Sequence, residues 1–171
     1  MLNILNLIII YIKKMKQIIK SFIKTLILSF SKTTIGLFLY QVIVNTAMIR
    51  NKDVIYSSLK MSFIIPNRLS SYRVNTFATK EPETLEWIKT IPNGSVMWDI
   101  GANIGLYSIY AAKARNCRVY AFEPSVFNLE MLARNIFLNN LQQQITIVPI
   151  ALSDMLSESL FQMSSTEWGG A

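Results

Sequence analysis

Short apolar runs alternate with helical segments over residues 95–154, and turn residues separate them. Three runs rich in Val, Ile and aromatic residues have the composition of strands. The elements expected in chain order are a strand at 96–100, a helix at 106–114, a strand at 118–122, a helix from Ser125 to Leu138 and a strand at 145–152. Strands that are almost continuously apolar are typical of parallel sheets covered on both faces. The sequence therefore predicts an α/β fold.

A glycine-bearing turn follows the first predicted strand. Asp99 lies near the end of that strand, and residues 101–105 lead into the next helix with Gly101 and Gly105 at their ends. Glycine lets the backbone turn sharply and approach a ligand, and the N–H groups at a helix start are free to meet one. Glu123 follows the second strand, and neighbouring parallel strands end at the same edge of a sheet. We expect Asp99 and Glu123 to face one ligand, with Glu123 accepting hydrogen bonds from a ribose.

Common phosphate-binding motifs do not fit this turn. A dinucleotide fingerprint counted from Gly101 needs glycine where this chain has Asn103 and Leu106. A P-loop needs Lys and Ser or Thr after its last glycine, but Leu106 follows Gly105. S-adenosylmethionine has no phosphate and carries a cationic sulfur and an amino group, so a looser turn beside a carboxylate suits it better. Asp99 is placed to meet the amino group.

Several segments together resemble the FkbM-type methyltransferase family. They are residues 98–108, 121–125 with Asn128, the lead-in 76–77 and 81–88, and 150–154, within a likeness that covers about residues 72 to 163. The resemblance implies a class I methyltransferase fold, which is a Rossmann-like, mostly parallel sheet of seven strands. It also implies S-adenosylmethionine as the cofactor and methylation of a hydroxyl, often on a sugar or a secondary metabolite.

The resemblance also implies a set of cofactor-binding residues. The methionine end of the cofactor would lie against Asp99, Gly101, Ala102 and Asn103 at the turn that Gly105 completes, the ribose on Glu123, and the adenine beside Pro124 and Ser125, with Ser153 or Asp154 at its edge. The implied reaction is an in-line displacement in which an acceptor oxygen attacks the sulfonium methyl, so positioning and proton removal do most of the catalytic work. No metal is expected, and no catalytic residue is identified.

The sequence ends at Ala171, shortly after the third predicted strand. Because the family sheet has seven strands, we expect a domain truncated after the third, with the acceptor site and any general base lying beyond Ala171. The first strand would then be an exposed apolar edge, which folded proteins normally cover.

Residues 1–30 form a basic helical segment by their spacing. Lys13, Lys16, Lys20 and Lys24 recur every three or four residues, and apolar side chains occupy the opposite face. This pattern favours a helix lying on an anionic membrane surface, or equally one packed on its own domain. A spanning helix is the third interpretation, although the uncharged stretch 33–49 has only 17 residues where a bilayer takes roughly 20. No cleavage site for a signal peptide follows the first apolar run.

Charge divides the chain. Residues 1–80 hold twelve Lys or Arg against the single Asp53, whereas the remainder is net acidic. We expect a helical extension at 1–49, a connecting loop region at 50–80 that is a loop or short hairpins, and the partial methyltransferase domain at 81–171. Nucleic-acid binding is disfavoured, because the basic residues alternate with Ile and Leu instead of stacking aromatics.

The residue types limit the chemistry. Cys117 is the one cysteine and histidine is absent, which excludes zinc sites and Ser-His or Cys-His catalysis within these residues and fits a reducing, cytoplasmic location with or without membrane association. The expected partner is a small-molecule or glycan acceptor. Two alternatives stay open: a nicotinamide-dependent oxidoreductase domain, and an inactive membrane-attached remnant.

Overall fold

The structure is a computed structural model that describes residues 2–154, 162–163 and 165–170. It divides into two compact units, Met1–Thr46 and Ala47–Ala171. The boundary between 46 and 47 lies close to the first one expected from the sequence, but no second division occurs near residue 80. Residues 47–80 belong to the same unit as the predicted methyltransferase segment.

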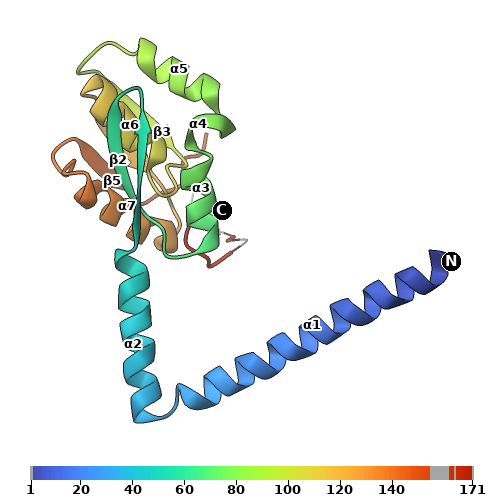
Figure 1. The fold of residues 1–171 in the computed structure, drawn as a ribbon. Coiled ribbons are helices and arrows are strands. Elements are labelled where there is room, and N and C mark those ends of the chain that lie inside the picture. The colour runs from blue at the N-terminus through green and yellow to red at the C-terminus, as the bar shows by residue number, and fades with distance from the viewer. Residues whose placement is uncertain (1, 155–161, 164, 171) are drawn as a thin grey trace. The chain divides into compact units, whose positions relative to one another are not determined.

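The first unit consists of α1 (Leu2–Phe30) and most of α2 (Thr34–Ile49) (Figure 1). Within α1, Lys13, Lys16, Lys20 and Lys24 share one face, and apolar side chains such as Ile18 and Phe22 are exposed on the other. Neither helix alone is long and apolar enough to cross a membrane, although the two taken together across their bend have the necessary length and composition.

A hairpin opens the second unit. Its strands β1 (Asn51–Tyr56) and β2 (Leu59–Ile64) pair antiparallel around Ser57 and Ser58, which both have positive φ. The helices α3 (Arg68–Asn75), α4 (Phe77–Lys80) and α5 (Pro82–Thr90) follow. Of the two structures expected for residues 50–80, a loop or short hairpins, the second is therefore found, and it is followed by α3 and α4, which the sequence did not predict. These residues fold because alternate side chains of β2 bury themselves in the core.

The predicted parallel sheet is confirmed. Strands β3 (Val96–Ile100), β4 (Arg118–Phe122) and β5 (Ile145–Val148) lie in the order β3-β4-β5, all parallel. Helices α6 (Leu106–Arg115) and α7 (Val126–Leu138) connect them. The chain thus has the α/β order of strands and helices that the sequence predicted for residues 96–148. Strand β5 is shorter than predicted and ends after Val148.

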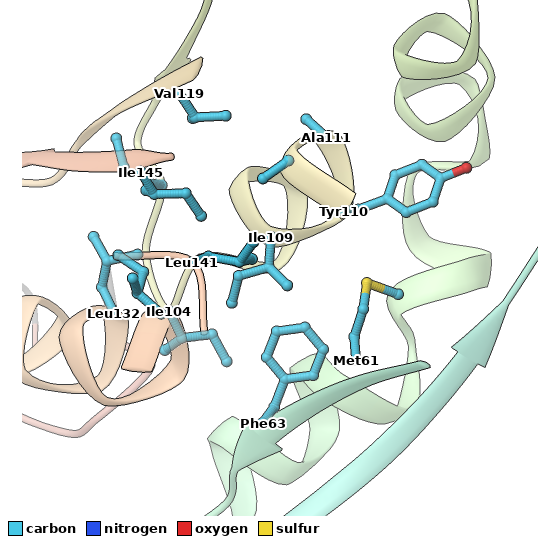
Figure 2. Packing of buried hydrophobic residues seen from close by; sticks show 14 of the residues in the cluster. Met61, Phe63, Ile104, Ile109, Tyr110, Ala111, Val119, Leu132, Leu141 and Ile145 are labelled. Carbon is cyan, nitrogen blue, oxygen red and sulfur yellow. The ribbon is translucent and has the colours of Figure 1, made fainter. Parts of the chain in front are cut away.

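The hairpin and the sheet share one core through α6. Figure 2 shows Met61 and Phe63 of β2 directed toward Ile109 and Tyr110 of α6, with Val119 of β4 also near this helix. All five side chains are buried. The hairpin therefore packs against α6 and α7, while α3 contacts β1 and α5 contacts α6.

The sheet's other face is open. Val96, Trp98 and Ile100 alternate along β3 and are 59%, 60% and 65% exposed. Strand β3 is also at the end of the strand order, as expected for an apolar edge.

Candidate cofactor site

The glycine turn is pinned to the neighbouring strand. The backbone N–H groups of Gly101 and Ala102 both donate to the carbonyl oxygen of Phe122, each at 2.9 Å. Gly101, Asn103 and Gly105 all have positive φ, of 80°, 51° and 85°. The chain can make this bend because glycine and asparagine adopt the left-handed conformation at little cost. The turn therefore projects from the carboxyl edge of the sheet, where ligands bind in such folds.

Asp99 is held by the first helix turn after the bend. Its Oδ2 accepts a hydrogen bond from Ser108 Oγ at 2.5 Å, and Ser108 is buried. Burial raises the pKa of Asp99 above its usual value of 3.8, the hydrogen bonds from Ser108 oppose that rise, and the charges of Glu123 and Glu81 add to it. Asp99 ends the strand before the turn, and the Asn103 N–H of that turn donates to Glu123, so the two predicted acids flank the same turn.

A pocket of about 390 Å³ opens beside Asp99 and the turn. Its lining comes from α3, α4, α5, β3, the turn and α6: Arg73, Thr76, Phe77, Lys80, Glu81, Thr84, 99–104, Leu106 and Tyr107. This volume is within the range of small-molecule sites. Burial and the neighbouring Glu81 raise the pKa of Tyr107, so its hydroxyl stays protonated at neutral pH. The pocket is thus lined by two carboxylates, two cationic side chains and the exposed backbone of Gly101.

Both carboxylate oxygens of Glu123 accept hydrogen bonds from other residues of the chain. Glu123 is only 5% exposed, and its Oε2 accepts a hydrogen bond from the Asn103 N–H at 2.8 Å. Its Oε1 accepts from the Ser125 N–H at 2.9 Å and from Asn128 Nδ2 at 3.3 Å. The carboxylate thereby joins the glycine turn to the start of α7.

Residues 167–170, termed the strap, bond to the two asparagines beside Glu123. The Gly170 carbonyl accepts from Asn103 Nδ2 at 3.0 Å and from Asn128 Nδ2 at 2.7 Å, and the Gly169 N–H donates to Asn128 Oδ1 at 3.0 Å. Both strap glycines are buried. The strap thereby holds the two asparagines whose N–H groups donate to Glu123.

The structure brings four of the ten predicted site residues together at the pocket, namely Asp99, Gly101, Ala102 and Asn103. The other six do not line the pocket. Gly105, Glu123 and Ser125 are buried, and Pro124 is half-buried. Ser153 and Asp154 are exposed and joined by a 3.3 Å hydrogen bond. The positions predicted for the methionine end therefore line one pocket, and those predicted for the adenosine do not line it.

Sequence reasoning missed the wall of the pocket that faces the turn. Arg73, Lys80 and Thr84 come from the helices between residues 68 and 90 and line the pocket. No motif singles out these side chains as ligands, because tertiary contacts of α3 with β1 and of α5 with α6 position them. Within the described ranges, no three His, Cys, Asp or Glu side chains are grouped to hold a metal ion.

Two curated proteins are similar in sequence to part of the chain. The AMB antimetabolite synthetase AmbE of Pseudomonas aeruginosa is 40% identical over 72 residues, which are 42% of this chain and 3% of AmbE. Methyltransferase sdnD of Sordaria araneosa is 34% identical over 67 residues, which are 39% of this chain and 26% of sdnD. The match thus spans about a quarter of sdnD and far less of AmbE. No family model matches the chain.

Solved methyltransferase structures are similar to part of the chain. A putative S-adenosyl-L-methionine-dependent methyltransferase from Methanococcus maripaludis is 31% identical with a TM-score of 0.40, covering 46% of this chain and 36% of that one. Precorrin-6y C5,15-methyltransferase from Geobacter metallireducens is 28% identical with a TM-score of 0.37, covering 41% and 37%. TYW2 of M. jannaschii, in complex with AdoMet, is 21% identical with a TM-score of 0.43, covering 57% and 42%.

Proposed function

We propose that residues 47–171 bind S-adenosylmethionine as part of an FkbM-type O-methyltransferase whose acceptor is a hydroxyl on a sugar or secondary metabolite. The observation that carries the proposal is the glycine turn, which is fixed at the sheet edge and opens with Asp99 onto the 390 Å³ pocket. The resemblance of residues 98–108 and 121–125 to the family and the sequence match to a methyltransferase support it.

The residues of the turn suit the methionine end of that cofactor. An ionised Asp99 attracts the ammonium group, and the exposed Gly101 backbone permits close approach because nothing lies within 4 Å of where a Cβ would stand. When bound, S-adenosylmethionine supplies an electrophilic methyl group on a cationic sulfur. The acceptor oxygen forms a bond to that carbon while the carbon–sulfur bond breaks with its electron pair left on sulfur, and the hydroxyl proton goes to a base.

Calorimetric titration of the full chain with S-adenosylhomocysteine tests the binding proposal, and NADH is the competing ligand. Gly101→Ala should weaken S-adenosylhomocysteine binding about tenfold or more, because a Cβ would enter the space that the ligand needs. Gly94→Ala is the matched control, since Gly94 has a similar φ of 78° and equal free space far from the turn. Binding of NADH in place of S-adenosylhomocysteine would favour the oxidoreductase alternative and contradict the proposal.

Methyl-labelled cofactor and a panel of free sugars and glycosides test the acceptor class. Label in a product that resists alkali, as a methyl ether does, supports O-methylation of a hydroxyl. Label released by alkali as methanol indicates a carboxyl acceptor instead. A chain that binds the cofactor but labels nothing while sedimenting with membranes would match the inactive remnant.

We also propose that α1 lies on the anionic, cytoplasmic surface of a membrane. The helix holds five lysines and no acidic residue, and Lys13, Lys16, Lys20 and Lys24 share its polar face. The side of the helix turned away from these lysines is apolar and exposed, with Met15, Ile18, Ile19, Phe22, Leu26 and Phe30. Insertion of the apolar face into the membrane and attraction of the lysines to anionic lipid both favour a helix that lies along the membrane surface. The two effects together strengthen its attachment.

Co-sedimentation with vesicles tests the attachment. The chain should pellet with phosphatidylserine-containing vesicles and much less with neutral phosphatidylcholine vesicles, and Gln at the four lysine positions should abolish the difference. Equal binding to both vesicle types would contradict the electrostatic part of the proposal. Resistance to extraction by alkaline carbonate from cell membranes would indicate a spanning segment instead.

A further inference from the structure

We propose that Arg73 binds the carboxylate of the methionine end of S-adenosylmethionine, an inference that rests on the proposed function. Arg73 lies in the last turn of α3 and lines the same pocket as Asp99 and the glycine turn. Its side chain is half-buried. A cation so placed faces the region where the methionine end would meet the turn.

The charges of the pocket match a zwitterion. Four charged side chains line it, and two of them neutralise each other because Lys80 Nζ lies 3.6 Å from Glu81 Oε1. Within the described part of the chain, neither Arg73 nor Asp99 takes part in an ion pair. The pocket therefore offers one positive and one negative group, and the methionine end of the cofactor carries one carboxylate and one ammonium.

The strap orients the Arg73 guanidinium. The Nε of Arg73 donates a hydrogen bond to the Gly169 carbonyl oxygen at 2.5 Å. None of the residues that the structure describes bonds to the two terminal nitrogens of this guanidinium. A guanidinium fixed at Nε still has N–H groups for a carboxylate, and such charge-assisted bonds are among the strong ones. Lys80 is less suited because it is exposed and already paired with Glu81.

The same bond links the two ends of the proposed site. The strap that contacts Arg73 also contacts Asn103 of the turn and Asn128 beside Glu123. A substitution at Arg73 can therefore act on the turn through the strap as well as on a bound carboxylate. The experiment has to separate these two effects.

Two ligands that differ by the carboxylate separate them. S-adenosylhomocysteine and its decarboxylated analogue, S-adenosyl-3-thiopropylamine, are titrated into the full chain and into Arg73→Gln. The unsubstituted chain should bind S-adenosylhomocysteine about ten- to a hundredfold more tightly than the analogue. Arg73→Gln should bind the two ligands about equally, with its affinity for the analogue within about twofold of the unsubstituted chain.

Arg73→Lys should recover part of the preference, because the charge remains without the paired geometry. Arg68→Gln, an exposed arginine on the same helix, should retain it in full. The inference is overturned if the unsubstituted chain does not distinguish the ligands. It is also overturned if Arg73→Gln weakens both equally, which would indicate a role through the strap. Failure of both ligands to bind the unsubstituted chain would instead refute the proposed function.

Discussion

Asp99 and Glu123 end neighbouring strands, but their carboxylates have different surroundings. Asp99 opens onto the pocket and is bonded on one oxygen by Ser108. Glu123 is buried and accepts bonds from two backbone N–H groups that belong to the turn and to the start of α7. A substitution of Glu123 therefore removes structural bonds as well as any ribose contact. Asp99 is the cleaner residue for testing cofactor binding.

The pKa of Asp99 predicts how binding depends on pH. Burial raises this pKa above 3.8, and Glu123 and Glu81 raise it further, while Ser108 lowers it. The carboxylate is ionised only above its raised pKa, so affinity for S-adenosylhomocysteine, whose ammonium it attracts, should rise as pH rises through that value. Calorimetry from about pH 4 to pH 8 measures this. Asp99→Asn should bind more weakly and lose this step, and a step retained in Asp99→Asn would contradict the assignment.

Gly105 lets the turn pack closely on Leu132, whereas Gly101 leaves room for a ligand to approach the backbone. A Cβ at Gly105 would stand 2.5 Å from Leu132 Cδ1, and its φ of 85° is unfavourable for alanine. We expect Gly105→Ala to lower the free energy of unfolding by about 2–4 kcal/mol, from strain and overpacking together. Gly101→Ala, with a similar φ but open space, should cost only about 1–2 kcal/mol. Urea denaturation measures both, and equal losses would contradict the packing argument.

At the scale of elements, the sequence predicted β3 and β4 to the residue because mostly apolar runs bounded by polar turns are typical of parallel strands. For residues 50–80 it predicted a loop or short hairpins, without the bounds of the β1–β2 hairpin. Its turn residues Ser57 and Ser58 have positive φ, a conformation usually signalled by Asn-Gly or Asp-Gly. The strap was not predicted either. Its bonds to Asn103 and Asn128 join residues about 40 to 67 positions apart, and no local pattern encodes such contacts.

Asn135 of α7 ties the hairpin to the glycine turn. Its side chain is buried, accepts from the Ile64 N–H at 2.8 Å and donates to the Ile104 carbonyl at 2.8 Å. Asn135→Ala would leave two buried backbone groups without partners. We expect a loss of about 2–4 kcal/mol in the free energy of unfolding, measured by chemical denaturation. The exposed Gln142→Ala should change it by less than about 0.5 kcal/mol, and a similarly small loss for Asn135→Ala would contradict the bridging role.

At the scale of the whole molecule, the open sheet face should make the chain self-associate. Val96, Trp98 and Ile100 form an exposed apolar stripe on the strand at the end of the strand order. Val96→Lys should reduce association, measured by light scattering over a concentration series, because a charge on an edge strand opposes pairing. Val126→Lys is the control, since Val126 is 63% exposed on α7 and outside this stripe. An equal reduction in both variants would indicate a general effect of charge.

The central claim is that the turn after β3 holds the methionine end of S-adenosylmethionine. Ultraviolet crosslinking of methyl-labelled S-adenosylmethionine to the full chain, followed by mass spectrometry of the peptides, tests it most directly. The account predicts label within residues 99–107 or on the facing wall at 73–84, prevented by excess S-adenosylhomocysteine and unaffected by NADH. Label confined to α1, or label that S-adenosylhomocysteine does not displace, would contradict it.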